Sequence, residues 1–427
     1  MREMKDSEIE WIGCIPKDWG INTIFQLCTQ VKNKNLGLQE KNLLSLSYGK
    51  IKRKNIDTVE GLLPESFDGY NIIDKDDIVL RLTDLQNDHT SLRVGISEER
   101  GIITSAYLTL RNRGDFVPKY LYYYLYSFDI SKGFYGMGAG VRQGLNWDGV
   151  KWLQVLAPLK DEQGRIATFL DIKCAKIDAV LEKTRASIDE YKKLKQAVIT
   201  QAVTKGIRGD RPMKDSGIEW TSSIPYDVSI SRIGLHFNII LGKMLCLTPL
   251  DETYTLESYY CAADVHFEGI SKGEKKRMWF NPTEKQQYLV NNGDLLVVEG
   301  GAGAGGCAIV RENDKQMFIQ NSIMIVRPKE QSSTRYLRYL MECFVKQGYI
   351  DVVCNKATIP HFTKDKLSTM PYIVFSVDEQ KEIADYLDVK CAEIDNLISK
   401  KEQYITEIEN YKKSLIYEYV TGKKEVD

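Results

Sequence analysis

The sequence lacks the features that mark a membrane protein, a secreted protein or a zinc protein. Its 427 residues contain no apolar run near the roughly 18 residues that cross a bilayer, and its first residues, MREMKDSEIEW, are acidic where a signal peptide has its apolar core. Nine cysteines form no C-x-x-C pair, and the four histidines do not cluster with them. We therefore expect a cytoplasmic protein with reduced, mostly buried thiols and no metal site.

A strong net charge is also missing. Lys and Arg number 58 and Asp and Glu 59, which leaves a formal charge of −1. Autonomous DNA-binding domains are commonly strongly basic, so this balance disfavours a solitary DNA-binding protein. It leaves open a local basic surface, or phosphate contacts that are shared with a partner. The length suggests two or three domains.

The most informative feature that is present is an internal repeat. Residues 4–18, MKDSEIEWIGCIPKD, return at 213–227 as MKDSGIEWTSSIPYD, with ten of fifteen positions identical. Residues 166–178, IATFLDIKCAKID, return at 383–395 as IADYLDVKCAEID, with nine of thirteen identical. A period above 200 residues excludes solenoids and propellers and predicts two similar domains in one chain. The segments between these anchors differ much more.

Each half begins with a mainly β region. In the first half, residues 20–115 contain short apolar or alternating runs separated by Gly, Asn and Asp turns, and a short helix is predicted from Pro118, since proline is favoured at the first helical position. The second half repeats this order, with strands predicted at 295–298 and 322–326 and a helix through 336–340.

Each half ends in a long helix, predicted over about 162–203 and 379–420, with Gly164 the only glycine or proline. In the first helix the apolar positions step by 4, 7, 3 and 7 residues, which is the seam of a coiled coil. The alternative is a helix packed on its own domain. The predicted seam residues are Ile177, Leu181, Ile188, Tyr191, Val198, Ile394, Ile398, Ile405, Ile408 and Leu415.

These patterns predict an α+β chain in which two pseudo-repeated, mainly β domains are separated by two long helices that form an antiparallel coiled coil. The predicted boundaries are 1–160 for the first β-rich domain, 161–206 for the first helix, 207–377 for the second domain and 378–427 for the second helix.

At this point the chain resembles the specificity subunits of type I restriction-modification enzymes. The resemblance covers essentially the whole chain and is carried by three repeated motifs. These are Met-Lys-Asp-Ser-x-Ile-Glu-Trp with a following Ile-Pro (4–16 and 213–225), Asp-Glu-Gln (161–163 and 378–380) and Leu-Asp-x-Lys-Cys-Ala-x-Ile-Asp (170–178 and 387–395).

The resemblance implies a non-catalytic DNA reader. Its two variable target-recognition domains would each read one half of a split, asymmetric target in double-stranded DNA, and its helices would set the unread spacer. It implies docking of two modification (methyltransferase) subunits and optionally of two restriction subunits. The chain would bind no cofactor itself; S-adenosylmethionine, ATP and Mg²⁺ are expected on the partner subunits.

Candidate DNA contacts are local groups of cations and amides, because Lys and Arg bind phosphates while Arg and Gln also read base edges. Two of the groups, residues 50–54 and 272–277, are expected to be loops, with ordinary solvated turns as the alternative. His361 by itself is more often an ordinary surface or structural histidine, and only its position makes it a candidate. The candidates are Lys50, Lys52, Arg53, Lys54, Arg81, Arg93, Arg142, Gln143, Lys272, Lys275, Lys276, Arg277, Lys356, Thr358 and His361.

Residues 301–306, Gly-Ala-Gly-Ala-Gly-Gly, match G-x-G-x-x-G and raise the possibility of a cofactor site. The context argues against it, because residues 307–310 form a β-type run where a dinucleotide site needs a helix N-terminus. A glycine turn that lets the backbone approach a neighbouring strand or DNA is the preferred interpretation.

Three rival functions remain open. A self-contained methyltransferase or nuclease is disfavoured, because none of the 11 prolines is adjacent to another as in an Asn/Asp-Pro-Pro-Tyr/Phe loop, no Cys-Pro pair occurs, and no cluster of carboxylates and lysine suggests metal-assisted cleavage. An interaction scaffold would pair two protein-binding domains through its coiled coil. A separate specificity subunit of a type II system is a close relative that the sequence does not distinguish.

Overall fold

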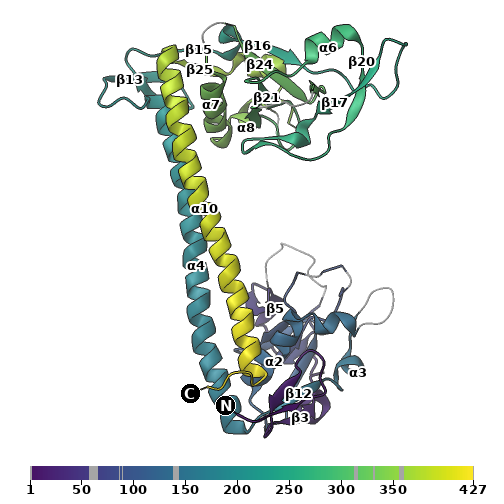
Figure 1. Ribbon diagram of the computed structural model, residues 1–427. Helices are drawn as coiled ribbons and strands as arrows, with labels where there is room; N and C mark the ends of the chain where they lie inside the picture. Colours follow the sequence, from purple (N-terminus) through teal and green to yellow (C-terminus); the bar gives the residue numbers. More distant parts are fainter. Residues whose placement is uncertain are drawn as a thin grey trace. The chain divides into compact units, whose positions relative to one another are not determined.

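The computed structural model describes residues 2–56, 66–85, 87–88, 90–137, 144–311, 316–329, 332–354 and 360–426. The chain divides into two compact units: unit 1 is Met1–Arg185 with Glu402–Asp427, and unit 2 is Ala186–Lys401. Each unit combines one β-rich region with parts of both long helices (Figure 1). In the part of the chain that is described, no helix has the length and apolar character of a membrane span.

Unit 1 is built on two four-stranded sheets. The first is antiparallel, and α2 packs against its edge strand β9. Its order is β4 (Cys28–Gln30), β11 (Leu108–Asn112), β8 (Ile78–Leu80) and β9 (Val94–Ile96). The second, in which β5 and β10 pair in parallel, has the order β6 (Lys50–Lys54), β5 (Leu43–Ser47), β10 (Gly101–Ile103) and β7 (Asn71–Ile73).

Unit 2 repeats this topology strand for strand in its first sheet. The order is β16 (Phe237–Leu241), β24 (Ile323–Pro328), β21 (Leu295–Val298) and β22 (Cys307–Ile309), and α7 packs against β22. The second sheet has the order β20 (Arg277–Phe280), β17 (Thr255–Tyr260) and β23 (Phe318–Ile319), again with one parallel pair. The internal sequence repeat therefore corresponds to a repeated fold.

Smaller elements complete the units. Two-stranded pairs are β1 (Met4–Asp6) with β2 (Cys14–Pro16), β3 (Gly20–Thr23) with β12 (Gln154–Ala157), β13 (Met213–Ile218) with β14 (Thr221–Pro225), β15 (Ser229–Arg232) with β25 (Pro371–Val374), and β18 (Val265–His266) with β19 (Gly269–Ile270). The shorter helices are α1 (Ile24–Leu27), α2 (Pro118–Ile130), α3 (Trp147–Val150), α5 (Ile233–His236), α6 (Pro282–Tyr288), α7 (Thr334–Lys346), α8 (Tyr349–Val353) and α9 (Lys364–Thr369), with 3₁₀ turns at Gly133–Gly136 and Ala262–Asp264.

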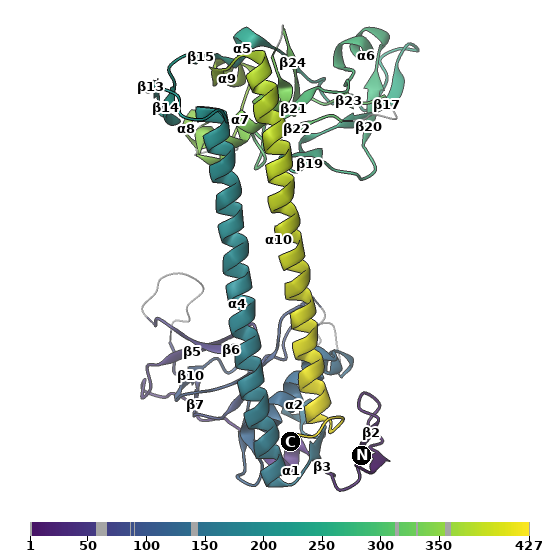
Figure 2. The same ribbon diagram turned by 60° about the vertical axis from the view of Figure 1, so that its left-hand side comes forward.

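The two long helices are α4 (Lys160–Lys205) and α10 (Val377–Val420). In unit 1 the two helix segments run in opposite directions, since Phe169 stacks on Tyr419 while Arg185, further along α4, pairs with Glu409, which lies earlier on α10. Unit 2 shows the same sense, since Lys195 pairs with Asp395 (2.7 Å) while Tyr191, earlier on α4, contacts Lys401, which lies later on α10. All ten predicted seam residues are buried or partly buried, whereas Leu194, Leu397 and Tyr404 are exposed. Figure 2 labels α4 and α10, the helices that carry these residues.

Buried polar contacts repeat between the units and explain why the frame is common to both. Arg111 makes a bidentate ion pair with the buried Asp77 in unit 1, and Arg327 does the same with Asp294 in unit 2, with N–O distances of 2.6–2.8 Å. Bidentate pairs of this kind fix geometry as well as adding energy. Gln163 adds a further contact, because its Oε1 accepts a hydrogen bond from the Val117 backbone at the start of α2.

The equivalent Gln380 accepts from the Ser333 backbone N–H at the start of α7 (2.9 Å). The C-terminal turn of each long helix is also held in a repeated way. The buried Tyr120 hydroxyl donates to the Val420 carbonyl in unit 1, and the Tyr336 hydroxyl donates to the Val203 carbonyl in unit 2, both at 3.1 Å. The β-rich region of each unit thus contacts the C-terminal turn of the long helix whose N-terminal part belongs to the other unit.

Candidate nucleic-acid interface

The cationic segment Lys50–Lys54, which the sequence predicts to be a loop, is strand β6 at the edge of a sheet. The prediction of a loop was wrong because four of the five residues are charged, a composition that does not indicate a strand. The single apolar residue, Ile51, packs against the core of this sheet. Since side chains alternate across a strand, Lys50, Lys52 and Lys54 share the opposite face, and all three are exposed.

Not every cation of β6 is available to a ligand. Arg53 is paired with Glu99, with its Nε 2.6 Å from Oε1, and this pair raises the pKa of the guanidinium. Lys50 has only a long contact of 3.5 Å with Asp178 of α4, and Asp178 lies closer to Lys412 at 2.6 Å. As far as the described residues show, the exposed lysine face of β6 can therefore engage phosphate without breaking a strong internal ion pair.

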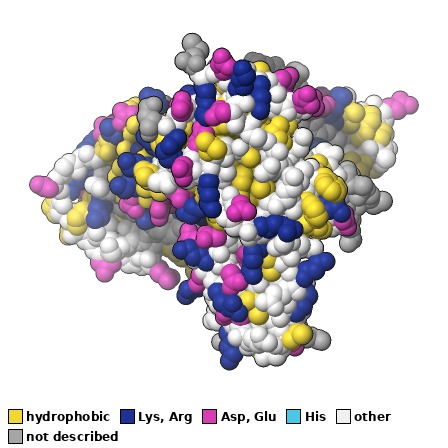
Figure 3. Space-filling view, turned by 90° about the horizontal axis from the view of Figure 1, so that it is seen from below, with side chains coloured by type: hydrophobic (Ala, Val, Ile, Leu, Met, Phe, Trp, Pro, Cys, Tyr) yellow, Lys and Arg dark blue, Asp and Glu magenta, His cyan; other side chains and the backbone are white. Residues whose placement is uncertain are grey.

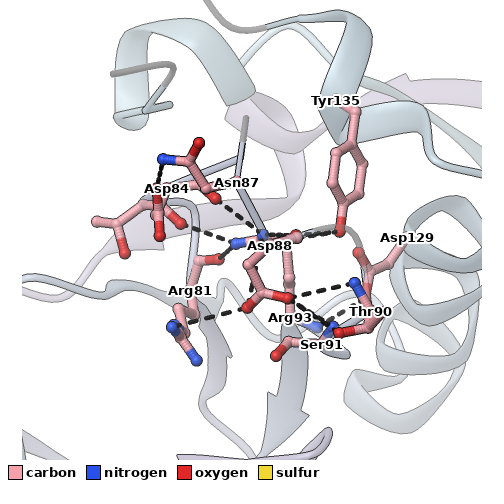
Figure 4. Close-up of polar contacts among 10 residues, drawn as sticks. Arg81, Asp84, Asn87, Asp88, Thr90, Ser91, Arg93, Asp129 and Tyr135 are labelled. Atoms are coloured by element: carbon pink, nitrogen blue, oxygen red, sulfur yellow. Dashed lines mark hydrogen bonds and ion pairs between the residues drawn. The ribbon is translucent and has the colours of Figure 1, made fainter. Parts of the chain in front are cut away.

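The connection between β8 and β9 is organised by Arg93, which is 0% exposed (Figure 4). Its Nη1 donates to the carbonyls of Arg81 (3.1 Å) and Thr83 (2.8 Å), and its Nη2 donates to the carbonyls of residues 84 and 88. Its Nε donates to the Tyr135 hydroxyl at 3.0 Å. Arg93 is therefore removed from the candidate DNA contacts, because its guanidinium is used to hold this connection in place.

Two carboxylates support Arg93 from different directions. Asp88 accepts hydrogen bonds from the Thr90 and Ser91 backbones. The contacts from Ser91, then the hydrogen bond from Thr90 and the charge of Arg93, hold the pKa of its carboxyl well below the ordinary value. Asp129 of α2 accepts from the Arg93 backbone N–H at 2.7 Å. Burial raises the pKa of Asp129 to about 6, against the opposing effect of that hydrogen bond.

The second oxygen of Asp129, Oδ1, is buried, and no donor among the described residues reaches it. No sequence motif indicates this cluster, because Asp129 and Tyr135 lie 36 and 42 residues from Arg93 in the chain.

Arg81 remains on the candidate surface. It lies directly after β8, is about one-third exposed, and makes a long ion pair of 3.8 Å with Asp88. Arg142 and Gln143, which the sequence singles out, lie outside the described residues, as do Lys356 and Thr358 in the second half.

In unit 2 the segment 272–277 is only partly a loop, because Arg277 begins β20. Lys272, Lys276 and Arg277 are exposed. Lys275 is not free, since its Nζ lies 2.7 Å from Asp264 Oδ1 and donates to the Ser271 carbonyl. The second unit therefore keeps three exposed cations of the four predicted, on a segment whose structure differs from that of β6.

The connection between β21 and β22 contains the glycine-rich residues 301–306 and is followed by strand β22, as expected. Its backbone pairs with that of His361, through a bridge with Gly300, and the His361 side chain is exposed. A Cβ on Gly305, whose φ is +81°, would lie 2.7 Å from Ile350 Cδ1, so the glycine permits close packing here. In unit 1 the equivalent connection is held by a buried arginine, so equivalent strands carry different loops.

The charge distribution agrees with the nearly neutral composition. On the face drawn in Figure 3, Lys and Arg side chains lie among Asp and Glu side chains. Over the described residues, no group of three or more His, Cys, Asp or Glu side chains is arranged to hold a metal ion. Six of the nine cysteines are buried, and all nine are free.

Known proteins share parts of this sequence and its fold. Residues 273–410 match the family model described as the type I restriction modification DNA specificity domain. The type I restriction enzyme MjaVIII specificity subunit of Methanocaldococcus jannaschii is 23% identical over 200 residues, which cover 46% of this chain and 43% of that protein. The matched part is thus less than half of that relative's length.

Solved structures show the same fold over nearly the whole chain. One similar chain comes from a study of the structural basis of complex assembly and conformational transition in the type I R-M system. It is 15% identical, with a TM-score of 0.70 over 96% of this chain and 99% of that one. The HsdS subunit from Thermoanaerobacter tengcongensis is 14% identical, with a TM-score of 0.52 over 96% and 98%. Sequence and fold confirm the predicted resemblance: this chain is similar to the specificity subunits of type I restriction-modification systems.

Proposed function

We propose that this chain is the DNA sequence-specificity subunit of a type I restriction-modification enzyme and reads a bipartite, asymmetric target. The observation that carries the proposal is a repeated frame with different loops. Both units have the same order of strands in their first sheet and the same ion pair between an arginine and a buried aspartate. The connection after β8, however, is held by Arg93, while that after β21 is a glycine turn. Two equivalent frames with unlike surfaces suit two half-sites of unlike sequence.

The exposed cations supply the affinity in this proposal. Lysines of β6 in unit 1, and Lys276 and Arg277 in unit 2, would bind phosphates and position each unit on the duplex. The near-zero net charge is expected if further phosphate contacts come from two modification subunits, with two restriction subunits as optional partners. The chain itself would perform no catalysis and bind no cofactor; S-adenosylmethionine, ATP and Mg²⁺ would act on the partners.

A direct test is selection of duplexes from a randomised library by the purified complex of the full chain with its modification subunits, followed by sequencing. The proposal predicts two conserved blocks of different sequence, separated by a gap of constant length in which every base is tolerated. A single contiguous block would contradict the two-reader arrangement. Recovery of unselected sequences would favour a protein-binding scaffold instead.

The long helices would form an antiparallel coiled coil that sets the spacer. Deleting seven residues from α4 together with seven from α10 should change the length of the unread gap and leave both half-site sequences as they are, because a whole heptad preserves the seam. Mapping of methylated adenines, in cells that express the variant with a modification subunit, measures the gap. An unchanged gap, or altered half-sites with the old gap, would refute the role of the helices as a spacer.

A further inference from the structure

The tip of the β5–β6 hairpin carries an exposed aromatic side chain in an unfavourable backbone conformation. Ser47 pairs with Lys50, so Tyr48 and Gly49 form a two-residue loop. Their φ angles are +48° and +73°, the signs that a type I′ hairpin turn requires. Gly suits the second position, whereas the first favours Asn, Asp or Gly and disfavours a bulky residue.

Tyr48 obtains no compensation from packing, because its side chain is 81% exposed. A non-glycine residue in the left-handed region costs about 1 kcal/mol or more, and such residues gather at functional sites. Asn followed by Gly would form the same turn at lower cost. The tyrosine at this position is therefore unexplained by folding and points to an interaction with another molecule.

The hairpin is held rigidly enough to present this side chain at a fixed place. A Cβ on Gly49 would lie 3.0 Å from Leu92 Cβ, and one on Gly95 of β9 would lie 2.5 Å from Leu46 Cδ1. The hairpin thus packs closely against β9 and against Leu92, the residue before Arg93. The tip and the connection that Arg93 organises belong to one continuous surface of unit 1.

We propose that Tyr48 is a specificity-determining residue that contacts base edges in the major groove of the first half-site. This inference rests on the proposed function. The β5–β6 pair belongs to a four-stranded sheet, so only its turn at Tyr48 and Gly49 would enter the DNA. The major groove, about 12 Å wide, admits such a turn more readily than the minor groove of about 6 Å. The lysines on one face of β6, spaced by about 6.6 Å along the strand, would bind phosphates beside the groove. Tyr48 would place its ring against thymine methyl groups and its hydroxyl against base acceptors.

The test compares sequences selected by the wild-type chain and by Tyr48→Asn, each in complex with the modification subunits, with the melting temperature measured for both chains. The variant should keep or raise the melting temperature, because it relieves the turn. It should lose about tenfold or more of the preference at one or two adjacent positions of one block. The other block, read by unit 2, is an internal control, and Tyr226→Asn, which removes another exposed tyrosine (71%), should change neither position.

Several outcomes would overturn the inference. An unchanged preference in both blocks shows that Tyr48 does not read bases. Equal weakening for all sequences shows a backbone contact and no readout. If Tyr48→Asn destabilises the chain, Tyr48→Gly repeats the test without the conformational cost. A wild-type chain that selects no split motif refutes the proposed function and this inference together, whereas a split motif that survives Tyr48→Asn unchanged refutes this inference alone.

Discussion

Replacing Arg93 by lysine separates a structural residue from a DNA contact. The buried guanidinium of Arg93 donates to four backbone carbonyls and to Tyr135. A lysine ammonium has three donors on one atom and cannot reproduce this fork, so at least two hydrogen bonds are lost. At about 1.5–3 kcal/mol for each bond to a charged group, the expected loss is about 3–6 kcal/mol in the free energy of unfolding of unit 1.

Three measurements test this prediction. Thermal unfolding of Arg93→Lys should show a lower transition for unit 1, hydrogen exchange in residues 81–93 should become faster, and selection from a randomised library should lose the first block while retaining the second. Arg100→Lys is the matched control. Arg100 is 57% exposed and pairs with Asp74 and Glu40 at the surface, where such pairs contribute little.

One combination of results would contradict the structural role of Arg93. If Arg93→Lys keeps the melting temperature and the slow exchange of this connection but weakens DNA binding, Arg93 contacts DNA directly and the connection does not depend on it.

Further predictions concern the buried carboxylates. Because the pKa of Asp129 is raised to about 6 in the folded chain, its contribution to stability is full below about pH 4 and is lost as the pH rises through 6, a change of about 3 kcal/mol. Asp129→Asn should abolish that slope in unfolding free energy between pH 4 and 7; an unaltered slope would assign it to other groups. Asp294→Ala, which leaves the charge of Arg327 unpaired, should cost about 3–5 kcal/mol. Asp77→Ala should cost less, since Arg111 retains a second carboxylate at 2.7 Å; equal losses in chemical denaturation would contradict this.

The elements that the sequence predicts well are those with a long or repeated signal. The long helices extend over Lys160–Lys205 and Val377–Val420, because the apolar seam and the lack of helix breakers persist over many turns. The helix from Pro118 begins where its proline places it. The position of these helices depends on local sequence, so local sequence was sufficient to predict them.

The site is harder to predict because its contacts are distant in sequence. Strand β6 forms since Ile51 packs on the core and a two-residue turn pairs it with β5, and neither feature outweighs its charged composition. Arg93 looks like any exposed cation in the sequence, yet its partners converge on it from α2 and from Tyr135. Tyr48 becomes informative only once its φ angle and its exposure are known together.

The central claim is that this chain alone chooses the DNA sequence on which its partners act. Single-molecule sequencing of DNA from cells that express the modification subunit with and without this chain tests it most directly. The account predicts methylated adenines in a split, asymmetric motif that disappears when the chain is omitted. Methylation of the same motif without the chain would contradict the account.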